Sequence, residues 1–143
     1  LRRRCLVIMS LTLEIVTPEK RVYSKSVERV KLPCSEGDME VLPGHIPLIT
    51  TVDAGEVRTQ SKGQSELLAV DKGFVEVFGD KVSILTEAAI DIEDIDLEAA
   101  EKAQKRAEEA LAKAEADNLD PAEVERLEAV ARFAITQKLL KKR

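Results

Sequence analysis

Over roughly the first two thirds of the chain, apolar and polar positions tend to alternate. Leu11, Leu13 and Ile15 alternate with Thr12 and Glu14, as expected for a half-buried strand whose successive side chains point to opposite faces. Similar runs follow around residue 22 and at 27–30, 39–42, 48–52, 56–60, 66–70, 74–78 and 81–85. About ten short strands, with turns roughly every 6–12 residues, predict an antiparallel β-sandwich or barrel.

After Glu87 the pattern becomes that of helices. An acidic stretch leads to a run whose apolar residues recur at helical spacing, namely Leu97, Ala100, Ala103, Ala107, Leu111 and Ala114. Asp94 or Asp96 is the expected N-cap of this helix, since an aspartate oxygen accepts hydrogen bonds from the first free amides. The calcium-loop interpretation of the acidic stretch is disfavoured, because it lacks the glycine of the sharp turn.

A second helix is predicted to begin after Asp120, with Pro121 at its first position and Glu123 completing a capping box. Its expected apolar face comprises Leu127, Val130, Ala131, Ala134, Ile135 and Leu139. Two helices of about 20 residues with a short connection predict an antiparallel hairpin. The expected organisation is a β-sandwich domain at 9–93 and a helical hairpin at 94–143, an all-β fold with an α appendage.

Alanine dominates the apolar face of the first helix and contributes to that of the second, so the seam between them buries little area. One buried methyl contributes roughly 0.8 kcal/mol, whereas alanine favours the helix itself. We therefore predict a hairpin that can leave its docked position with both helices intact.

Composition excludes several classes of function. The net charge of −5 and the 3% aromatic content disfavour a nucleic-acid partner. No apolar run reaches the roughly 18 residues that a spanning helix needs, so direct membrane insertion is not expected. Residues 1–8 are too short and lack the cleavage site of a signal peptide, and we interpret them as an extension before a natural start at Met9.

Candidate chemistry is sparse. The chain has one histidine, and no nucleophile–base pairing or glycine-rich phosphate loop accompanies it. Cys5 and Cys34 show neither metal-ligand spacing nor a catalytic partner, which favours two free thiols. We therefore expect no catalytic residues, no metal and no obligatory cofactor, and a module that contacts other proteins.

Residues 35–50 hold the densest group of turn-forming glycines and prolines in the chain. Gly37 can adopt positive φ, Pro43-Gly44 forms a turn dipeptide, and Pro47 removes a backbone donor. These fixed turns indicate a shaped contact surface. His45 has two interpretations, either a partner contact or pH-sensitive group, or a histidine that satisfies backbone groups near the turn.

This stretch also carries a resemblance. Ser35-Glu36-Gly37-Asp38 followed by the segment Leu42-Pro43-Gly44-His45-Ile46-Pro47-Leu48 resembles the signature of the epsilon subunit of bacterial F-type ATP synthases. Residues 73–77, residues 82–89 and the helical hairpin follow in the same order from about Ser10 onward. Members of this family are non-catalytic rotor-stalk subunits with a ten-stranded β-sandwich and a C-terminal hairpin.

The resemblance implies partners for particular residues. Pro43, Gly44, His45 and Pro47 would face the γ subunit, and Glu36, Gly37 and Asp38 would meet the polar loops of the c-ring. In bacterial members the hairpin can extend along γ into the α/β catalytic head, where it blocks ATP hydrolysis. The expected location is peripheral, on the cytoplasmic face of the bacterial plasma membrane.

Some members bind ATP at the folded hairpin. Ile95, Asp96 and Ala100 match the motif that opens the first helix, but Ala99 stands where the motif has arginine. Arg126 and Arg132 remain available on the second helix. Because one bidentate phosphate partner is missing, we expect weak or absent ATP binding.

Two accounts from outside this family remain open: a free-standing β-sandwich binding module whose helical tail mediates dimerisation, and, less favoured, an enzyme. A ligand-binding sandwich usually offers aromatic side chains in a cleft. Here Phe74, Phe78 and Phe133 occupy apolar positions of the predicted strands and helix, which disfavours the binding module.

Overall fold

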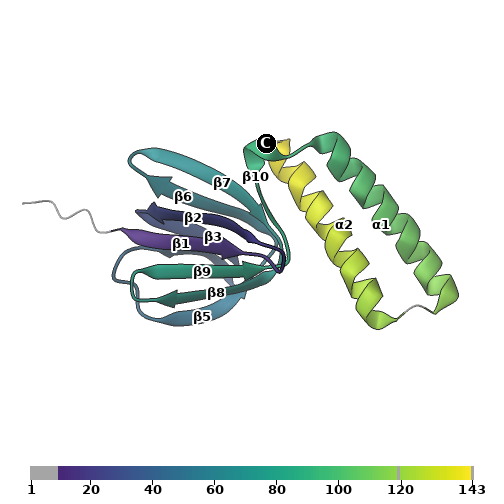
Figure 1. Cartoon of the computed structure of the whole chain (residues 1–143), viewed down its shortest axis with the longest axis horizontal. Helices are drawn as coiled ribbons and strands as arrows, with labels where there is room; N and C mark the ends of the chain where they lie inside the picture. The colour runs from purple at the N-terminus through teal and green to yellow at the C-terminus, as the bar shows by residue number, and fades with distance from the viewer. Residues whose placement is uncertain (1–9, 119, 143) are drawn as a thin grey trace, which may run out of the picture.

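The computed structural model describes residues 10–118 and 120–142, with a ten-stranded β domain followed by two helices (Figure 1). The extension 1–8, the start at Met9 and Cys5 lie outside the described residues. The strands are β1 (Leu11–Val16), β2 (Arg21–Val27), β3 (Arg29–Cys34), β4 (Gly37–Val41), β5 (Leu48–Val52), β6 (Gly55–Ser61), β7 (Gln64–Val70), β8 (Gly73–Phe78), β9 (Lys81–Thr86) and β10 (Ala89–Asp91).

The strands follow the order β10-β7-β6-β3-β5-β8-β9-β1-β2, and β4 pairs with β3 beside this path. All pairs are antiparallel except β1 with β9, which run parallel because a long excursion through β2–β8 separates them. The sheet curls so that β2 approaches β6 and β7. There Tyr23 Oη donates to Glu66 Oε2 at 2.7 Å, and Lys25 Nζ donates to Glu66 Oε1 at 2.8 Å. These bonds join strands from opposite ends of the path and nearly close the sandwich.

Branched aliphatic side chains fill the interior, as the alternation predicts. Leu13, Ile15, Leu32 and Ile84 are completely buried, and valines occupy most of the remaining core. Strand β10 is the element that the sequence did not indicate. Its residues belong to the expected acidic stretch, and three residues are too few to show alternation. Pairing with β7 defines it, with Ala89 opposite Val70.

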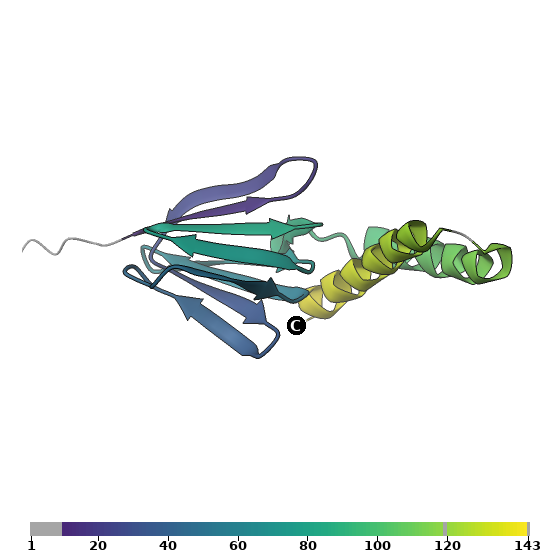
Figure 2. The same ribbon diagram turned by 90° about the horizontal axis from the view of Figure 1, so that it is seen from below.

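The hairpin follows a short 3₁₀ helix, η1 (Ile92–Asp94), and comprises α1 (Leu97–Asp117) and α2 (Pro121–Lys141). Asp96 caps α1 by accepting from Glu98 N at 3.0 Å, and Asp120 caps α2 by accepting from Ala122 N at 3.1 Å. In both views the hairpin lies at the end of the sandwich opposite to the start of β1 (Figures 1 and 2). The predicted sandwich with a helical hairpin is confirmed.

The seam of the hairpin is made of alanine, as expected. Its buried side chains are those of Ala100, Ala107, Ala114, Ala131 and Ala134. The predicted apolar face of α2 is wrong at three positions, because Val130, Ile135 and Leu139 are exposed, the last by 65%. Apolar residues surround much of α2, and a contact built on alanines is too narrow to cover all of them.

Candidate protein-interaction surfaces

Large apolar side chains lie exposed on the outside of the sandwich. On β8, Val75 and Val77 point into the core, so Phe74, Glu76 and Phe78 point outward. Phe74 is 57% exposed and Phe78 is 71% exposed. The expectation that these phenylalanines lie at apolar, buried positions of the strand is therefore wrong. The alternation of β8 already indicates this, because burying Val75 and Val77 turns Phe74 and Phe78 outward.

Strand register gathers further apolar residues around them. Leu85 of β9 lies opposite Phe74, and Ile49 of β5 lies opposite Glu76, so all of them share one side of the sheet. Ile49 is 72% exposed and Leu85 is 51% exposed. We call Ile49, Phe74, Phe78 and Leu85 the outer apolar face. Contiguous exposed apolar patches of this kind mark sites of protein contact.

The neighbouring part of the same outside surface is charged. Glu14 of β1 pairs with Arg21 of β2 at 2.8 Å and with Lys81 of β9 at 3.0 Å. The hydrogen bond from Lys81, together with the charges of both partners, lowers the pKa of Glu14 against the opposing effect of burial. The outside of the sandwich thus divides into a self-paired charged region and the unpaired outer apolar face.

The segment predicted to face γ connects β4 to β5 and adjoins the outer apolar face. Pro43-Gly44 forms a turn closed by His45 N, which donates to Leu42 O at 3.1 Å, with Gly44 at φ +85°. Such a φ requires glycine at the third turn position. His45 Nδ1 lies 2.7 Å from Ile46 O, in keeping with the interpretation of a histidine that satisfies the backbone. Pro47 leads into β5, and Ile46 is 74% exposed.

The segment predicted to meet the c-ring lies at the other end of β4. Glu36, Gly37 and Asp38 are exposed around the β3–β4 turn, where Gly37 has φ +119°. Asp38 approaches Lys31 Nζ at 3.4 Å. This tip is polar, in contrast to the Pro43–Pro47 segment, and the strand register places it at the same end of the sandwich as the hairpin.

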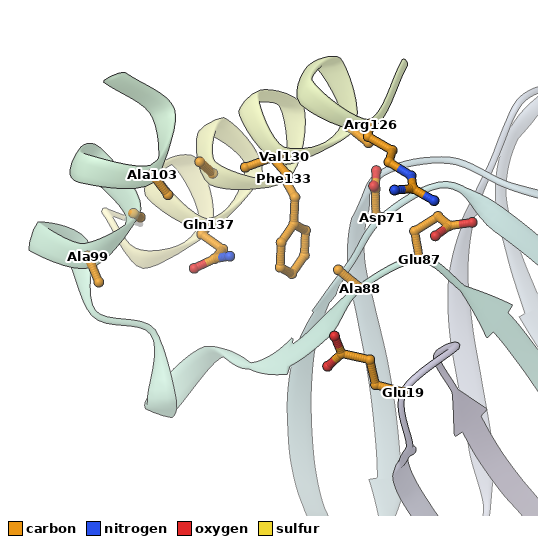
Figure 3. A pocket seen from close by; sticks show the side chains of 13 residues that line it. Glu19, Asp71, Glu87, Ala88, Ala99, Ala103, Arg126, Val130, Phe133 and Gln137 are labelled. Atoms are coloured by element: carbon orange, nitrogen blue, oxygen red, sulfur yellow. The ribbon is translucent and has the colours of Figure 1, made fainter. Parts of the chain in front are cut away.

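A cavity of about 600 Å³ lies between the hairpin and the sandwich, beside the points where they touch (Figure 3). Two of the five residues predicted for nucleotide binding, Ala100 and Arg126, line it. The other three predicted residues stabilise the fold. Ile95 is buried, Asp96 caps α1, and Arg132 donates to Asp71.

The charges around this cavity are mainly negative. Glu19, Glu87 and Asp71 come from the sandwich, and among the described residues Arg126 is the one cationic side chain that lines the cavity (Figure 3). Ala99 contributes a methyl group where the resemblance calls for arginine, and Phe133 adds an apolar ring to the lining. The lining therefore opposes a polyphosphate more than it attracts one.

Asp71 is the functional candidate that the sequence did not reveal. It follows β7 in a Val-Asp-Lys-Gly stretch that looks like an ordinary turn. Burial of its carboxylate against α2 depends on long-range packing, and no local signal announces it. Among the described residues, no group of three or more metal-ligating side chains is close enough to hold an ion, and no helix is long and apolar enough to cross a membrane.

Comparison with known proteins agrees with this architecture. Residues 10–92 match the beta-sandwich domain of the ATP synthase delta/epsilon chain, and residues 93–137 match the long alpha-helix domain of the same chain. The ATP synthase epsilon chain of Pelotomaculum thermopropionicum is 46% identical over 101 residues, covering 71% of this chain and 75% of the relative. That of Bacillus subtilis is 45% identical over 102 residues, covering 71% and 77%.

A similar fold occurs in a solved structure. One chain of the Euglena gracilis mitochondrial ATP synthase, in a complex of OSCP, F1 and c-ring, superposes with a TM-score of 0.64 and 22% identity. The match covers 92% of this chain and 81% of that one, so it spans both the sandwich and the hairpin. With both domains matched in sequence by family profiles, the chain belongs to the ATP synthase delta/epsilon family.

Proposed function

We propose that this chain is a non-catalytic subunit of the central stalk, which couples proton translocation to ATP synthesis and restrains ATP hydrolysis. The observation that carries the proposal is the outer apolar face, an unpaired surface on the sandwich of an ATP synthase delta/epsilon chain. A rotor subunit needs such a surface to fix it to the shaft. The γ subunit is its proposed partner, with Pro43, Gly44, His45 and Pro47 at the edge of the contact.

The polar tip has a different proposed partner. Glu36, Gly37 and Asp38 present charge and backbone without exposed apolar area, which suits contact with the polar loops of a c-ring. With this partner the subunit would lie peripherally on the cytoplasmic face of the bacterial plasma membrane. The Euglena complex, which includes a c-ring, supports this proposal through the shared fold of one of its chains.

The hairpin is the proposed brake on hydrolysis. Its narrow alanine seam and the cavity between it and the sandwich support a docked state that the hairpin can leave. In the extended state it would reach the α/β catalytic head. The basic residues of its last turn, Lys138 and Lys141, would then approach acidic segments of that head.

The test is ATP hydrolysis by the matching catalytic complex depleted of its own epsilon subunit. This complex is titrated with the full chain and with a version ending at Asp94. Binding by both versions with inhibition by the full chain alone is the expected result. Binding without inhibition by either version would reject the brake, and failure of both to bind would favour the free-standing module with a dimerising tail.

Point variants test the apolar contact separately. Phe78→Ser and Ile49→Ser should each weaken binding to γ by about 2 kcal/mol, roughly thirtyfold, because central apolar residues dominate interfaces. Arg21→Ser on the charged region is the matched control and should bind normally, since Arg21 already has its partner in Glu14. Equal loss in all three variants would reject the outer apolar face as the contact.

For ATP as a regulatory ligand we propose weak or absent binding. Arg126 offers a cation to the cavity, while Glu19 and Glu87 repel phosphate. Calorimetry on the purified chain should show no binding at submillimolar ATP, and Ala99→Arg should strengthen whatever binding remains. A submillimolar dissociation constant for the unaltered chain would overturn this expectation.

A further inference from the structure

One buried ion pair connects the hairpin to the sandwich. Arg132 of α2 donates from Nε to Asp71 Oδ1 at 2.8 Å and from Nη2 to Asp71 Oδ2 at 3.1 Å. The side chain of Asp71 is 1% exposed and that of Arg132 is 35% exposed. Two parallel bonds of this kind fix orientation as well as distance, so the pair specifies one docked position of α2.

Asp71 is held firmly by the sandwich. Its amide donates to Ala88 O at 2.9 Å, and its carbonyl accepts from Thr86 Oγ1 at 2.9 Å. The turn beyond it is packed so tightly that a Cβ at Gly73 would lie 1.9 Å from Leu85 O. The carboxylate therefore stays in place when α2 moves, and separation of the hairpin must break the pair.

Few other contacts hold α2 at this position. Lys141 Nζ donates to the carbonyls of Ile92 at 3.2 Å and Glu93 at 3.3 Å, within the connection to the hairpin. Phe133 reaches toward Ala88 at the edge of the cavity (Figure 3). Among the side chains that the structure describes, Arg132 and Asp71 form the only pair joined by side-chain to side-chain hydrogen bonds between the helices and the sandwich.

We propose that the Arg132–Asp71 pair is a latch that sets the fraction of molecules whose hairpin is docked. Loss of Arg132 leaves a buried carboxylate without its cation only in the docked state, because water solvates Asp71 once the hairpin departs. Removing the cation therefore penalises docking selectively. By setting the docked fraction, the latch would control how often the hairpin can inhibit ATP hydrolysis. Its role in the enzyme therefore rests on the proposed function of the hairpin.

Three variants test whether loss of the pair destabilises the docked state more than the undocked state. Arg132→Gln should raise the ratio of undocked to docked molecules by about tenfold or more, since it strands a buried charge. Asp71→Asn should raise the ratio less, because the remaining guanidinium is partly solvated and the amide oxygen still accepts. The double variant should raise the ratio less than Arg132→Gln alone does, because Asp71→Asn removes the buried charge that Arg132→Gln leaves without a partner.

Arg126→Gln is the matched control. Arg126 lies on the same helix as Arg132, lines the cavity together with Asp71 and is exposed, and no ion pair is found for it among the described residues. Its replacement removes the same charge from α2 without touching the pair. Any effect of overall hairpin charge would appear equally in this control.

The measurement is electron–electron spin distance in the isolated full chain, with one label at Gln64 of the sandwich and one at Ala112 of α1. Both positions are exposed, and both native cysteines are replaced by serine. The expected result is a second, different distance population that grows in Arg132→Gln and stays at its original level in Arg126→Gln. Equal populations in the original chain and both variants would overturn the latch.

The hydrolysis assay separates the latch from the proposed function. If Arg132→Gln raises the undocked population, it should also inhibit the depleted catalytic complex at lower concentration than the original chain does. A population shift without any change in inhibition would leave the latch standing and reject the hairpin as the brake. Far-UV circular dichroism confirms that each variant retains its strands and helices.

Discussion

The sandwich and the hairpin achieve order by different means. The sandwich buries long branched side chains completely, with Leu13, Ile15 and Ile84 at 0% exposure. The hairpin packs alanines against alanines and relies on aspartate caps and helix propensity. The first mode gives a rigid platform whose outside surface is free for binding. The second gives helices that are stable locally and only loosely attached, which is what a movable element requires.

Ile84→Ala tests the rigid half of this comparison and has the largest expected effect. Ile84 is completely buried between neighbouring strands, so its truncation leaves a cavity as well as a loss of transfer energy. The free energy of unfolding should fall by about 2–5 kcal/mol. Denaturant titration of the version ending at Asp94 measures it, with Ile135→Ala in the full chain as an exposed control. A loss under about 1 kcal/mol would show that the core is less tightly packed than described.

Amide hydrogen exchange compares the two regions in one experiment. Amides of β8 and β9 should open only with global unfolding, whereas those of α1 and α2 open when the hairpin undocks and frays. We expect the strands to exchange at least about tenfold more slowly than the helices, a difference of roughly 1.4 kcal/mol. Equal protection in both regions would contradict a separable hairpin.

Ala107→Gly weakens the hairpin alone. Ala107 is buried in the seam, so the change removes a packed methyl worth roughly 0.8 kcal/mol and about 1 kcal/mol of helix propensity. Helix amides should lose protection by that combined amount while β8 and β9 keep theirs. Ala112→Gly, on the exposed side of α1, should show the propensity part only. A matching loss in the strands would mean that the two regions unfold together.

Sequence patterns predicted most of the fold, because the decisive signals were local. Alternation located nearly all strands, and Asp96 and Asp120 marked the helix starts that the structure shows. Local patterns carry no information on which strands pair, so strand β10 and the parallel contact between β1 and β9 could not be predicted from them.

The candidate surfaces were harder to predict. The turn at Pro43-Gly44 has the expected geometry, and the partners assigned to it stay predictions. The alternation of β8 already indicates the outer apolar face, but the apolar character of phenylalanine favours the core and conceals it. The Arg132–Asp71 pair spans 61 positions of sequence and joins a turn to a helix face, so only the assembled structure brings it together.

The smallest predicted effect concerns closure of the sandwich at low pH. The hydrogen bonds from Lys25 and Tyr23 lower the pKa of Glu66 below its ordinary value. A carboxyl group with a lowered pKa stabilises the fold above its unfolded-state pKa, and that contribution is lost as pH falls through its folded-state pKa. Glu66→Gln should therefore reduce stability at pH 7 by a few tenths of a kcal/mol, because the Lys25 pair is substantially exposed.

The difference between Glu66→Gln and the original chain should shrink as the pH falls below the ordinary range for glutamate. Glu40→Gln, in the exposed pair with Arg29, serves as the control and should leave stability nearly unchanged. Thermal melting of the version ending at Asp94 at a series of pH values measures both, and a constant difference would mean that Glu66 supports closure by its shape and not by its charge.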